Sequence, residues 1–444
     1  MRYLPHTQED RDAMLKVTGN TSLEDLFATI PEACRMTSSW DIPAPKTEWE
    51  LNAHIQQLAD KMGVTHRHRV LIGAGSNDHY IPATIKALMS RSEFLTAYTP
   101  YQPEMAQGTL QGIFEYQTLT ARLLGMDVVN ASMYDGGSAL AEALLMGLRI
   151  GKKKTTVAVS KAIHPHYRGV VQAYLAPTGF EIVELPYLEN GRTDLSGLDE
   201  IDSLAAVAIQ SPNFLGVVEQ LEQAAAAIHE QKALCITGFS EPLAYGLLKS
   251  PGACGADISC GEGQSFGLSR SFGGPGLGMF GCKDTFTRNL PGRLVGETTD
   301  LDGKRGYVLT LATREQHIRR DKATSNICSN QGVCAMTAGM YMASLGGTGL
   351  RELAKLNFDK AEYFKQGLIE AGANPCFVAP TFNEFVVELP DNFSQARKNL
   401  LEQGIVAGLP LENYYPELSG KYLFGVSETS SKAVMDAVIK EVQS

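Results

Sequence analysis

Short apolar runs alternate with amphipathic stretches through the middle of the chain. The apolar runs have the length of buried strands, and the amphipathic stretches repeat apolar residues every three or four positions, as helices do. The predicted strands cover residues 156–160, 181–185, 205–210 and 233–237. The predicted helices cover residues 107–124, 139–150, 167–175 and 218–230. Repeated strand–helix units predict an α/β fold with a mainly parallel sheet that is covered on both faces.

The two ends of the chain follow different patterns. Thr7 to Asp10 reads as a capping box that opens a helix reaching Gly19, and another helix is predicted over 47–62. These helices and the Pro-rich link between them offer little core, so residues 1–65 are predicted to form an N-terminal arm. The remainder is predicted to form a large domain over 66–345 and a small α+β C-terminal domain over 346–444. The predicted elements of the small domain are helices at 350–371, 394–403 and 431–442 and strands at 385–389 and 422–426.

The stretch from Gly255 to Lys283 is very rich in glycine: GADISCGEGQSFGLSRSFGGPGLGMFGCK. It reads as a strand, a glycine-rich turn and a second strand. Glycine loses more backbone entropy on folding than other residues, so this density indicates positive φ angles or a close approach of another backbone. The part from Asp257 to Arg270 contains no lysine, and the meaning of that absence depends on the rest of the chain.

Composition narrows the class of protein. The 444 residues are 44% hydrophobic and 20% charged, as in a globular protein with a large core. The net charge of −10 argues against binding to nucleic acid or to a membrane surface, and no apolar run has the length of a membrane span. We see no signal-peptide pattern, and eight cysteines without a CxxC pair favour reduced thiols, so we expect a cytoplasmic protein. His164-Pro165-His166 lacks a third clustered ligand, so we expect no metal.

Two segments are candidates for a binding site. Residues 93–104 contain two prolines and two tyrosines and are predicted to form a rigid extended loop, whose tyrosines either pack a turn or line an active site. Tyr134 and Asp135 precede Gly136-Gly137-Ser138 and the predicted helix 139–150. The backbone N–H groups at this helix start either receive an anion or are capped by Ser138 or Asp135.

Three long runs carry a specific resemblance. They are AYTPYQPEMAQGTLQGIFEYQT at 97–118, NASMYDGGSALAEA at 130–143 and TREQHIRRDKATSNICSNQ at 313–331. They resemble the glycine cleavage system P protein, the decarboxylating glycine dehydrogenase. In particular, they resemble the N-terminal-half chains, called alpha or subunit 1, that are found where this enzyme is split in two. The opening RYLPHT fits as well, so the resemblance covers essentially the whole chain.

The resemblance implies the pyridoxal-phosphate (PLP)-dependent transferase fold of type I. In that fold a lysine in the glycine-rich turn holds the cofactor, an aspartate on the preceding strand pairs with its ring, and a helix start equivalent to Gly136-Gly137-Ser138 holds its phosphate. Counting back from the turn Gly273-Gly274-Pro275-Gly276 places Gln264 at the lysine position, and the aspartate position falls near Thr237. An amide and a hydroxyl cannot replace these groups. The resemblance therefore implies a pseudo-active site with a vestigial phosphate site.

The resemblance also implies the chemistry of an assembled enzyme. A lysine-bearing beta subunit would hold PLP, and an alpha2beta2 heterotetramer would decarboxylate glycine and pass the aminomethyl group to the lipoyl arm of H protein. Such an enzyme is an oxidoreductase of glycine catabolism. The alpha subunit would place supporting residues around the partner's pocket, at the subunit interface. The candidates are Tyr98, Thr99 and Tyr101 in the loop, and Arg314, Gln316, His317, Arg319 and Asn326 in the later polar run.

Three alternatives stay open on the sequence. The arginines suit a carboxylate or phosphate ligand, but they suit salt bridges between subunits equally well. The chain is alternatively a self-sufficient PLP enzyme of the aminotransferase or desulfurase type that uses another lysine, in which case the isolated chain takes up PLP. A third interpretation is a structural or regulatory homologue without a catalytic partner.

Overall fold

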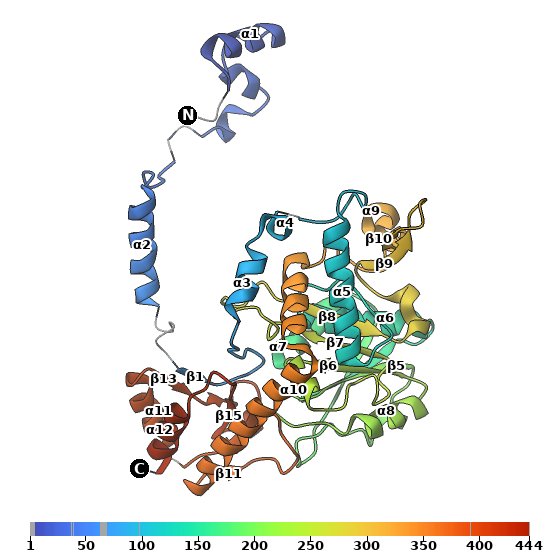
Figure 1. The fold of residues 1–444 in the computed structure, drawn as a ribbon, viewed down its shortest axis with the longest axis vertical. Helices are drawn as coiled ribbons and strands as arrows, with labels where there is room; N and C mark the ends of the chain where they lie inside the picture. The colour runs from blue at the N-terminus through green and yellow to red at the C-terminus, as the bar shows by residue number, and fades with distance from the viewer. Residues whose placement is uncertain are drawn as a thin grey trace. The chain divides into compact units, whose positions relative to one another are not determined.

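The chain divides into two compact units, Met1–Thr65 and His66–Ser444, which are drawn in Figure 1. The computed structural model describes residues 5–36, 38, 40–62, 69–96, 98–390 and 392–443. In this part of the chain, no helix is long and apolar enough to cross a membrane.

The first unit consists of helices with almost no core. Helix α1 (Gln8–Thr18) begins with the predicted capping box, in which Asp10 accepts the Thr7 N–H at 2.8 Å and donates its own N–H to the Thr7 hydroxyl. Helix α2 (Glu48–Lys61) exposes its predicted apolar face of Leu51, Ile55 and Leu58. Leu15 is the one buried residue among those described in this unit, so its apolar surface is left uncovered by its own residues.

The second unit is built on a seven-stranded sheet in the order β2-β8-β7-β6-β5-β3-β4. Neighbouring strands from β7 to β4 are parallel, and only β8 runs antiparallel to its neighbours, which confirms the predicted mainly parallel sheet. The strands are β2 (Val128–Val129), β3 (Thr156–Ser160), β4 (Glu181–Leu185), β5 (Leu204–Gln210), β6 (Leu234–Phe239), β7 (Ile258–Glu262) and β8 (Gly278–Cys282).

Helices pack on both faces of this sheet because its central strands are apolar on both sides. In β5, Val207 and Ile209 join one core with residues of α5, α8 and α10, whereas Ala206 and Ala208 join another with residues of α6 and α7. The helices around the sheet are α3 (Ala83–Met89), α4 (Ser92–Leu95), α5 (Gln107–Leu124), α6 (Gly136–Gly151), α7 (Pro165–Leu175) and α8 (Leu221–Glu230).

Two predicted boundaries near the candidate segments are wrong. Helix α6 begins at Gly136, before the predicted residue 139, because Asp135 caps it and brings both glycines into the first turn. Residues Ser92–Leu95 form the short helix α4, so the loop is extended only after it.

The hairpin of β9 (Leu294–Thr299) and β10 (Arg305–Thr310) was not predicted, although Asp302-Gly303 is a turn signal between its strands. In Figure 1 this hairpin, α4 and α9 (Gln316–Arg319) lie at the same end of the unit.

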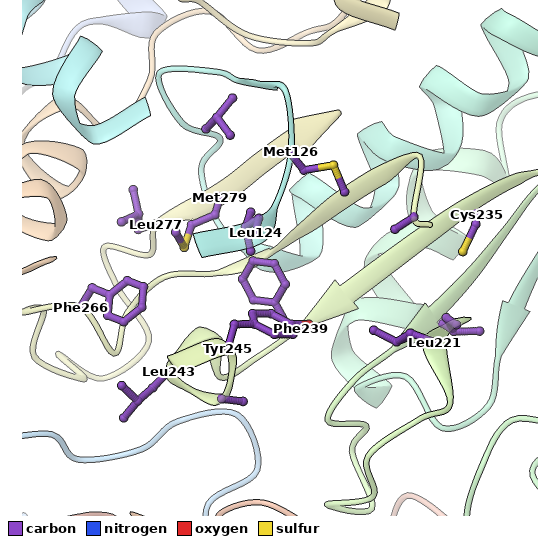
Figure 2. Close-up of a cluster of buried hydrophobic side chains, with 14 of the residues drawn as sticks. Leu124, Met126, Leu221, Cys235, Phe239, Leu243, Tyr245, Phe266, Leu277 and Met279 are labelled. Atoms are coloured by element: carbon purple, nitrogen blue, oxygen red, sulfur yellow. The ribbon is translucent and has the colours of Figure 1, made fainter. Parts of the chain in front are cut away.

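The glycine-rich turn is anchored in the core between β7 and β8. Phe266 and Leu277 from the turn are fully buried, and Figure 2 shows them with Met279 of β8, with Phe239 at the end of β6 and with Tyr245 in the short 3-10 helix that follows (Pro242–Gly246). The Phe239 and Tyr245 rings meet edge to face with centroids 5.6 Å apart. Packing therefore fixes the two ends of the turn, whereas residues 271–273 in its middle are exposed.

The C-terminal part is α+β, as predicted. Helix α10 (Gly332–Glu370) is broken at Gly346, whose φ of +64° suits glycine, and beyond it lies an antiparallel sheet in the order β11-β12-β15-β14. The first strand of the unit, β1 (Arg69–Leu71), pairs with β13 (Ile405–Ala407) and not with the large sheet. The other elements are β11 (Asn374–Pro375), β12 (Glu384–Glu388), β14 (Leu409–Pro410), β15 (Lys421–Gly425), α11 (Phe393–Glu402) and α12 (Lys432–Gln443).

Glu384 of β12 makes the stability of this fold depend on pH. Its buried carboxylate accepts the Gly75 N–H at 3.3 Å, and burial raises its pKa from 4.5 to about 7. A raised folded pKa means that the contribution of Glu384 is present below pH 4.5 and is lost as the pH rises through about 7.

We therefore expect Glu384→Gln to stabilise the chain above pH 7, by on the order of 3 kcal/mol, and to have almost no effect near pH 4.5. Urea unfolding at both pH values measures this difference. Glu388→Gln, at the exposed end of the same strand, is the matched control and should change neither value. Equal effects of Glu384→Gln at the two pH values would contradict the assignment.

Candidate functional site

Four polar side chains follow the carboxyl ends of the central parallel strands. His164, Gln210, Glu241 and Glu262 follow or end β3, β5, β6 and β7, and all four are buried. This edge is where open α/β sheets bind ligands. We call these four residues the strand-end cluster.

The histidine of the strand-end cluster is packed rather than exposed. Its ring stacks on Tyr167 at 4.8 Å, meets Phe214 edge-on, and places Nε2 3.0 Å from the Ala74 carbonyl oxygen. Burial lowers the pKa of His164 to about 4, so the ring is neutral at physiological pH. The side-chain oxygen of Gln210 accepts the backbone N–H of His164 at 2.9 Å. Within the described residues, no group of three His, Cys, Asp or Glu side chains is placed to hold a metal ion.

Glu241 belongs to a buried charged network. It accepts hydrogen bonds from Asn77 at 3.1 Å and from the Ser265 hydroxyl at 2.9 Å, and it lies 2.9 Å from Nε2 of His79. The other ring nitrogen of His79 lies 2.9 Å from Glu428, which comes from the C-terminal part of the chain. This network joins three segments: the residues after β6, the glycine-rich turn, and the segment of Glu428 that follows β15 in the C-terminal part of the chain.

Glu262 lies at the start of α6. Its Oε2 accepts the Gly136 N–H at 3.1 Å, and its Oε1 accepts the N–H groups of Gln264 at 3.1 Å and Leu277 at 2.7 Å. Asp135 caps the same helix by accepting the Ser138 N–H at 2.8 Å. The N–H groups of Gly136 and Ser138 therefore bind carboxylates of this chain.

Gln264 and Thr237, which the resemblance places at the two positions that define the cofactor, do not supply ligands for it. The Gln264 amide donates to the Leu268 carbonyl oxygen at 2.6 Å and so closes a turn of backbone. Thr237 is fully buried in β6, where a carboxylate would be needed to pair with a cofactor ring. With a glutamine, a threonine and a carboxylate-filled helix start, this region of the chain does not fit PLP.

The predicted loop residues gather around an arginine that the sequence did not single out. Arg293 is 5% exposed, and its Nη1 donates to the Thr99 hydroxyl. Its guanidinium lies 5.4 Å from the centre of the Tyr101 ring, and its Nε lies 3.6 Å from a carboxylate oxygen of Glu315. We call Thr99, Tyr101, Arg293 and Glu315 the Arg293 cluster.

The two tyrosines of the loop are open on its outer side. Tyr98 is 78% exposed and Tyr101 is 67% exposed, and the Tyr98 hydroxyl is 3.5 Å from that of Ser329. Met105, farther along the loop, is 84% exposed. The buried Arg293 thus lies against the Tyr101 ring, Tyr98 contacts only the half-buried Ser329 among the partners described, and both rings are largely exposed.

The predicted arginines have backbone partners. Arg314 donates to the carbonyl oxygens of Leu290, Gly292 and Leu311, so it fixes the segment that leads to Arg293. Burial lowers the pKa of Arg314. Arg319 donates to the Thr313 carbonyl oxygen at 3.3 Å. His317 and Gln316 lie in α9, but the side chain of His317 lies outside the described part of the structure.

The end of the late polar run contacts the segment around the start of α6. Ser325 donates to the buried Glu142 of α6 at 2.7 Å, and the Cys328 N–H donates to the Tyr134 hydroxyl at 3.0 Å. Asn326, between them, is exposed. The structure therefore brings the loop, the late run and the start of α6 together, although they are far apart in the sequence.

Five residues of these two clusters were not predicted: Gln210, Glu241, Glu262, Arg293 and Glu315. Glu262 had a usable signal, because it is an acidic residue in the glycine-rich stretch, two positions before Gln264. Glu241 lies two positions after β6 and Arg293 directly before β9, in irregular segments where no periodicity marks them.

Comparisons with known proteins show the family of the chain. The family described as "Glycine cleavage system P-protein" matches residues 1–442. A chain from Desulfotalea psychrophila named "Probable glycine dehydrogenase (decarboxylating) subunit 1" is 64% identical over 443 residues, which are 100% of this chain and 98% of that one.

Solved structures give the same result for the fold. The crystal structure of glycine decarboxylase (P-protein) of the glycine cleavage system, in inhibitor-bound form, is 42% identical with a TM-score of 0.90 and covers 100% of this chain and 99% of its own. A NifS-like protein is 14% identical with a TM-score of 0.61 over 85% of this chain and 98% of its own, a likeness in fold alone. The fold is the PLP-dependent transferase fold of type I. With a family match and a 64% identical relative that both span nearly its whole length, the chain belongs to the glycine cleavage system P-protein family.

Proposed function

We propose that this chain is the alpha subunit of a two-chain glycine decarboxylase, and that it completes the active site of a beta subunit that carries PLP. The observation that carries the proposal is the state of its own site. Gln264 stands at the lysine position, and the helix start that would take a phosphate is filled by Glu262. These two residues also argue against a self-sufficient PLP enzyme.

The proposed reaction joins decarboxylation to transfer. The bond between the carboxyl carbon and Cα of glycine breaks, and carbon dioxide leaves. Cα, which keeps its amino group, then forms a bond to one sulfur of the lipoyl disulfide on H protein; the sulfur–sulfur bond breaks, and the other sulfur takes a proton and becomes a thiol. The disulfide is the oxidant, and PLP on the partner would supply the electron sink for the carbon–carbon cleavage.

The Arg293 cluster and Tyr98 are the proposed contribution of this chain to the shared pocket. Tyr98 and Tyr101 present rings and hydroxyl groups to a facing surface, and Thr99 and Arg293 hold the loop in place. A loop that is already fixed loses little entropy when a partner or substrate binds. Arg314 and Arg319 support the neighbouring backbone, and His317 lies on the same short helix as Arg319.

The proposed assembly is an alpha2beta2 heterotetramer in the cytoplasm. The first unit leaves large apolar side chains exposed, with Trp40 and Trp49 each at 73%, as expected of a surface that a partner covers. An obligate interface of this kind buries on the order of 2,000–5,000 Å². H protein and glycine are the other proposed partners.

Co-expression tests this proposal. The chain purified together with a lysine-bearing beta subunit should decarboxylate glycine in the presence of lipoylated H protein, whereas either chain alone should not. Light scattering should give the mass of two chains of each kind. A monodisperse monomer that ignores the beta subunit at micromolar concentration would refute the proposal.

A further inference from the structure

The carboxylate of Glu262 is bound as a ligand would be. Three backbone N–H groups converge on it: that of Gly136 at the start of α6, and those of Gln264 and Leu277 at the two ends of the glycine-rich turn. The side chain is only 9% exposed. The Gly136 N–H lies at the start of a 16-residue helix, where anions bind, and together with the two N–H groups of the turn it binds a carboxylate of this chain.

The surroundings fit closely around this carboxylate. A Cβ atom added to Gly276 would lie 3.0 Å from Oε2 of Glu262 and 3.0 Å from Cβ of Asp135. A Cβ atom added to Gly136 would lie 2.5 Å from the Tyr167 hydroxyl oxygen. Gly276 of the turn, Gly136 of α6 and Tyr167 therefore leave little free space at the helix start beside Glu262.

The charges around Glu262 oppose a second anion. Asp135 lies beside it and caps the same helix, so a phosphate group entering here would meet two carboxylates. Burial raises the pKa of Glu262, and the three N–H groups work against that rise. Those three N–H groups can only donate, so they stabilise an acceptor and not a protonated carboxyl group.

We propose that Glu262 is an internal substitute for the cofactor's phosphate group, which closes the anion site of this chain to phosphate-bearing ligands. The inference rests on the proposed function for the identity of the cofactor. It goes further by naming the single side chain that occupies the site.

The test compares Glu262→Ala with Glu262→Gln in the full chain. Glu262→Ala removes the side chain from the N–H groups and leaves space, so inorganic phosphate should bind at least about tenfold more tightly than to the unchanged chain, a gain of about 1.4 kcal/mol. Glu262→Gln keeps the volume and should show no gain. Isothermal titration calorimetry measures binding, and hydrogen exchange at Gly136, Gln264 and Leu277 locates it.

Two results would overturn the proposal. One is saturable phosphate binding to the unchanged chain with protection of these three amides. The other is a folded Glu262→Ala chain, verified by near-ultraviolet circular dichroism, that gains no affinity. If Glu262→Ala does not fold, hydrogen exchange of the unchanged chain is measured with and without phosphate. Protection of the three amides by phosphate overturns the proposal, and unchanged exchange supports it. A failure of the proposed function would appear separately, as absent decarboxylation in the unchanged complex.

Discussion

Replacing His79 with alanine is expected to lower the free energy of unfolding of the second unit by about 3–5 kcal/mol, because it leaves two buried carboxylates without their shared cation. The ring nitrogens of His79 each lie 2.9 Å from a carboxylate oxygen, one of Glu241 and one of Glu428. The side chains of all three residues are less than a tenth exposed. Because Glu428 follows β15 in the C-terminal part of the chain, the C-terminal part should unfold first in the variant.

The pH dependence of the same variant follows from two shifted groups. Burial alone would lower the pKa of His79, but the two carboxylates outweigh it and raise the pKa from 6.5 to about 10. Burial alone would raise the pKa of Glu428, but its hydrogen bond to His79 dominates the lowering to about 2. The His79 contribution is present below pH 6.5 and is lost as the pH rises through about 10. The Glu428 contribution is present above pH 4.5 and is lost as the pH falls through about 2.

The stabilisation is therefore complete between about pH 4.5 and 6.5 and declines on both sides. Urea midpoints across the pH range measure it. The difference between the unchanged chain and His79→Ala should be largest in that window and shrink toward pH 10. Exposed His229, which is paired with Asp257, is the control position and should give a much smaller change. A His79→Ala chain with an unchanged midpoint at pH 6 would show that the network does not stabilise the fold.

Replacing Arg293 with methionine is expected to reduce kcat/KM of the assembled enzyme by about 10- to 100-fold, because a loop displaced by 1 Å can cost this much. The substitution keeps the length of the side chain but removes its bond to Thr99, its contact with Tyr101 and its ion pair with Glu315. Arg293 is a positioning residue in this account, so its loss should lower kcat while assembly stays normal.

Two comparisons separate positioning from general destabilisation. Arg305→Met is the matched control, because Arg305 also lies over a tyrosine ring, 5.7 Å from the centre of Tyr307, but is exposed. It should leave kcat unchanged. Arg293→Met and Thr99→Val should be non-additive, since each removes the same hydrogen bond. Normal kcat in a normally assembled Arg293→Met complex would return Arg293 to a purely structural role.

The sequence predicts best those elements whose bounds are set by residues within or next to the element itself. Helix α5 has the predicted bounds because its apolar face is continuous and Gly125 ends it with a left-handed residue. The start of α6 was misplaced because Asp135 and Ser138 are both plausible caps, and only the folded structure shows which residue precedes the first turn. The missed hairpin of β9 and β10 carries polar residues that dilute its alternation.

The site was harder to predict because its contacts join distant segments. Tyr98, Thr99 and Tyr101 could be singled out from their proline-braced loop, but Arg293 reaches Thr99 across 194 positions of sequence. His79 and Glu428 are 349 positions apart. No local pattern encodes such pairs. By contrast, the absence of a lysine between Asp257 and Arg270 is read directly from the sequence, and the assignment of Gln264 to the lysine position stays a prediction.

Where the cofactor is held in the assembled enzyme decides whether this chain completes an active site without binding PLP itself. Borohydride reduction of the co-purified complex in the presence of PLP, followed by peptide mapping, locates it. We expect one labelled lysine for each pair of chains, located on the beta subunit, and no labelled lysine in this chain. Stoichiometric labelling of a lysine of this chain, such as Lys161 or Lys283, would refute the proposed division of roles.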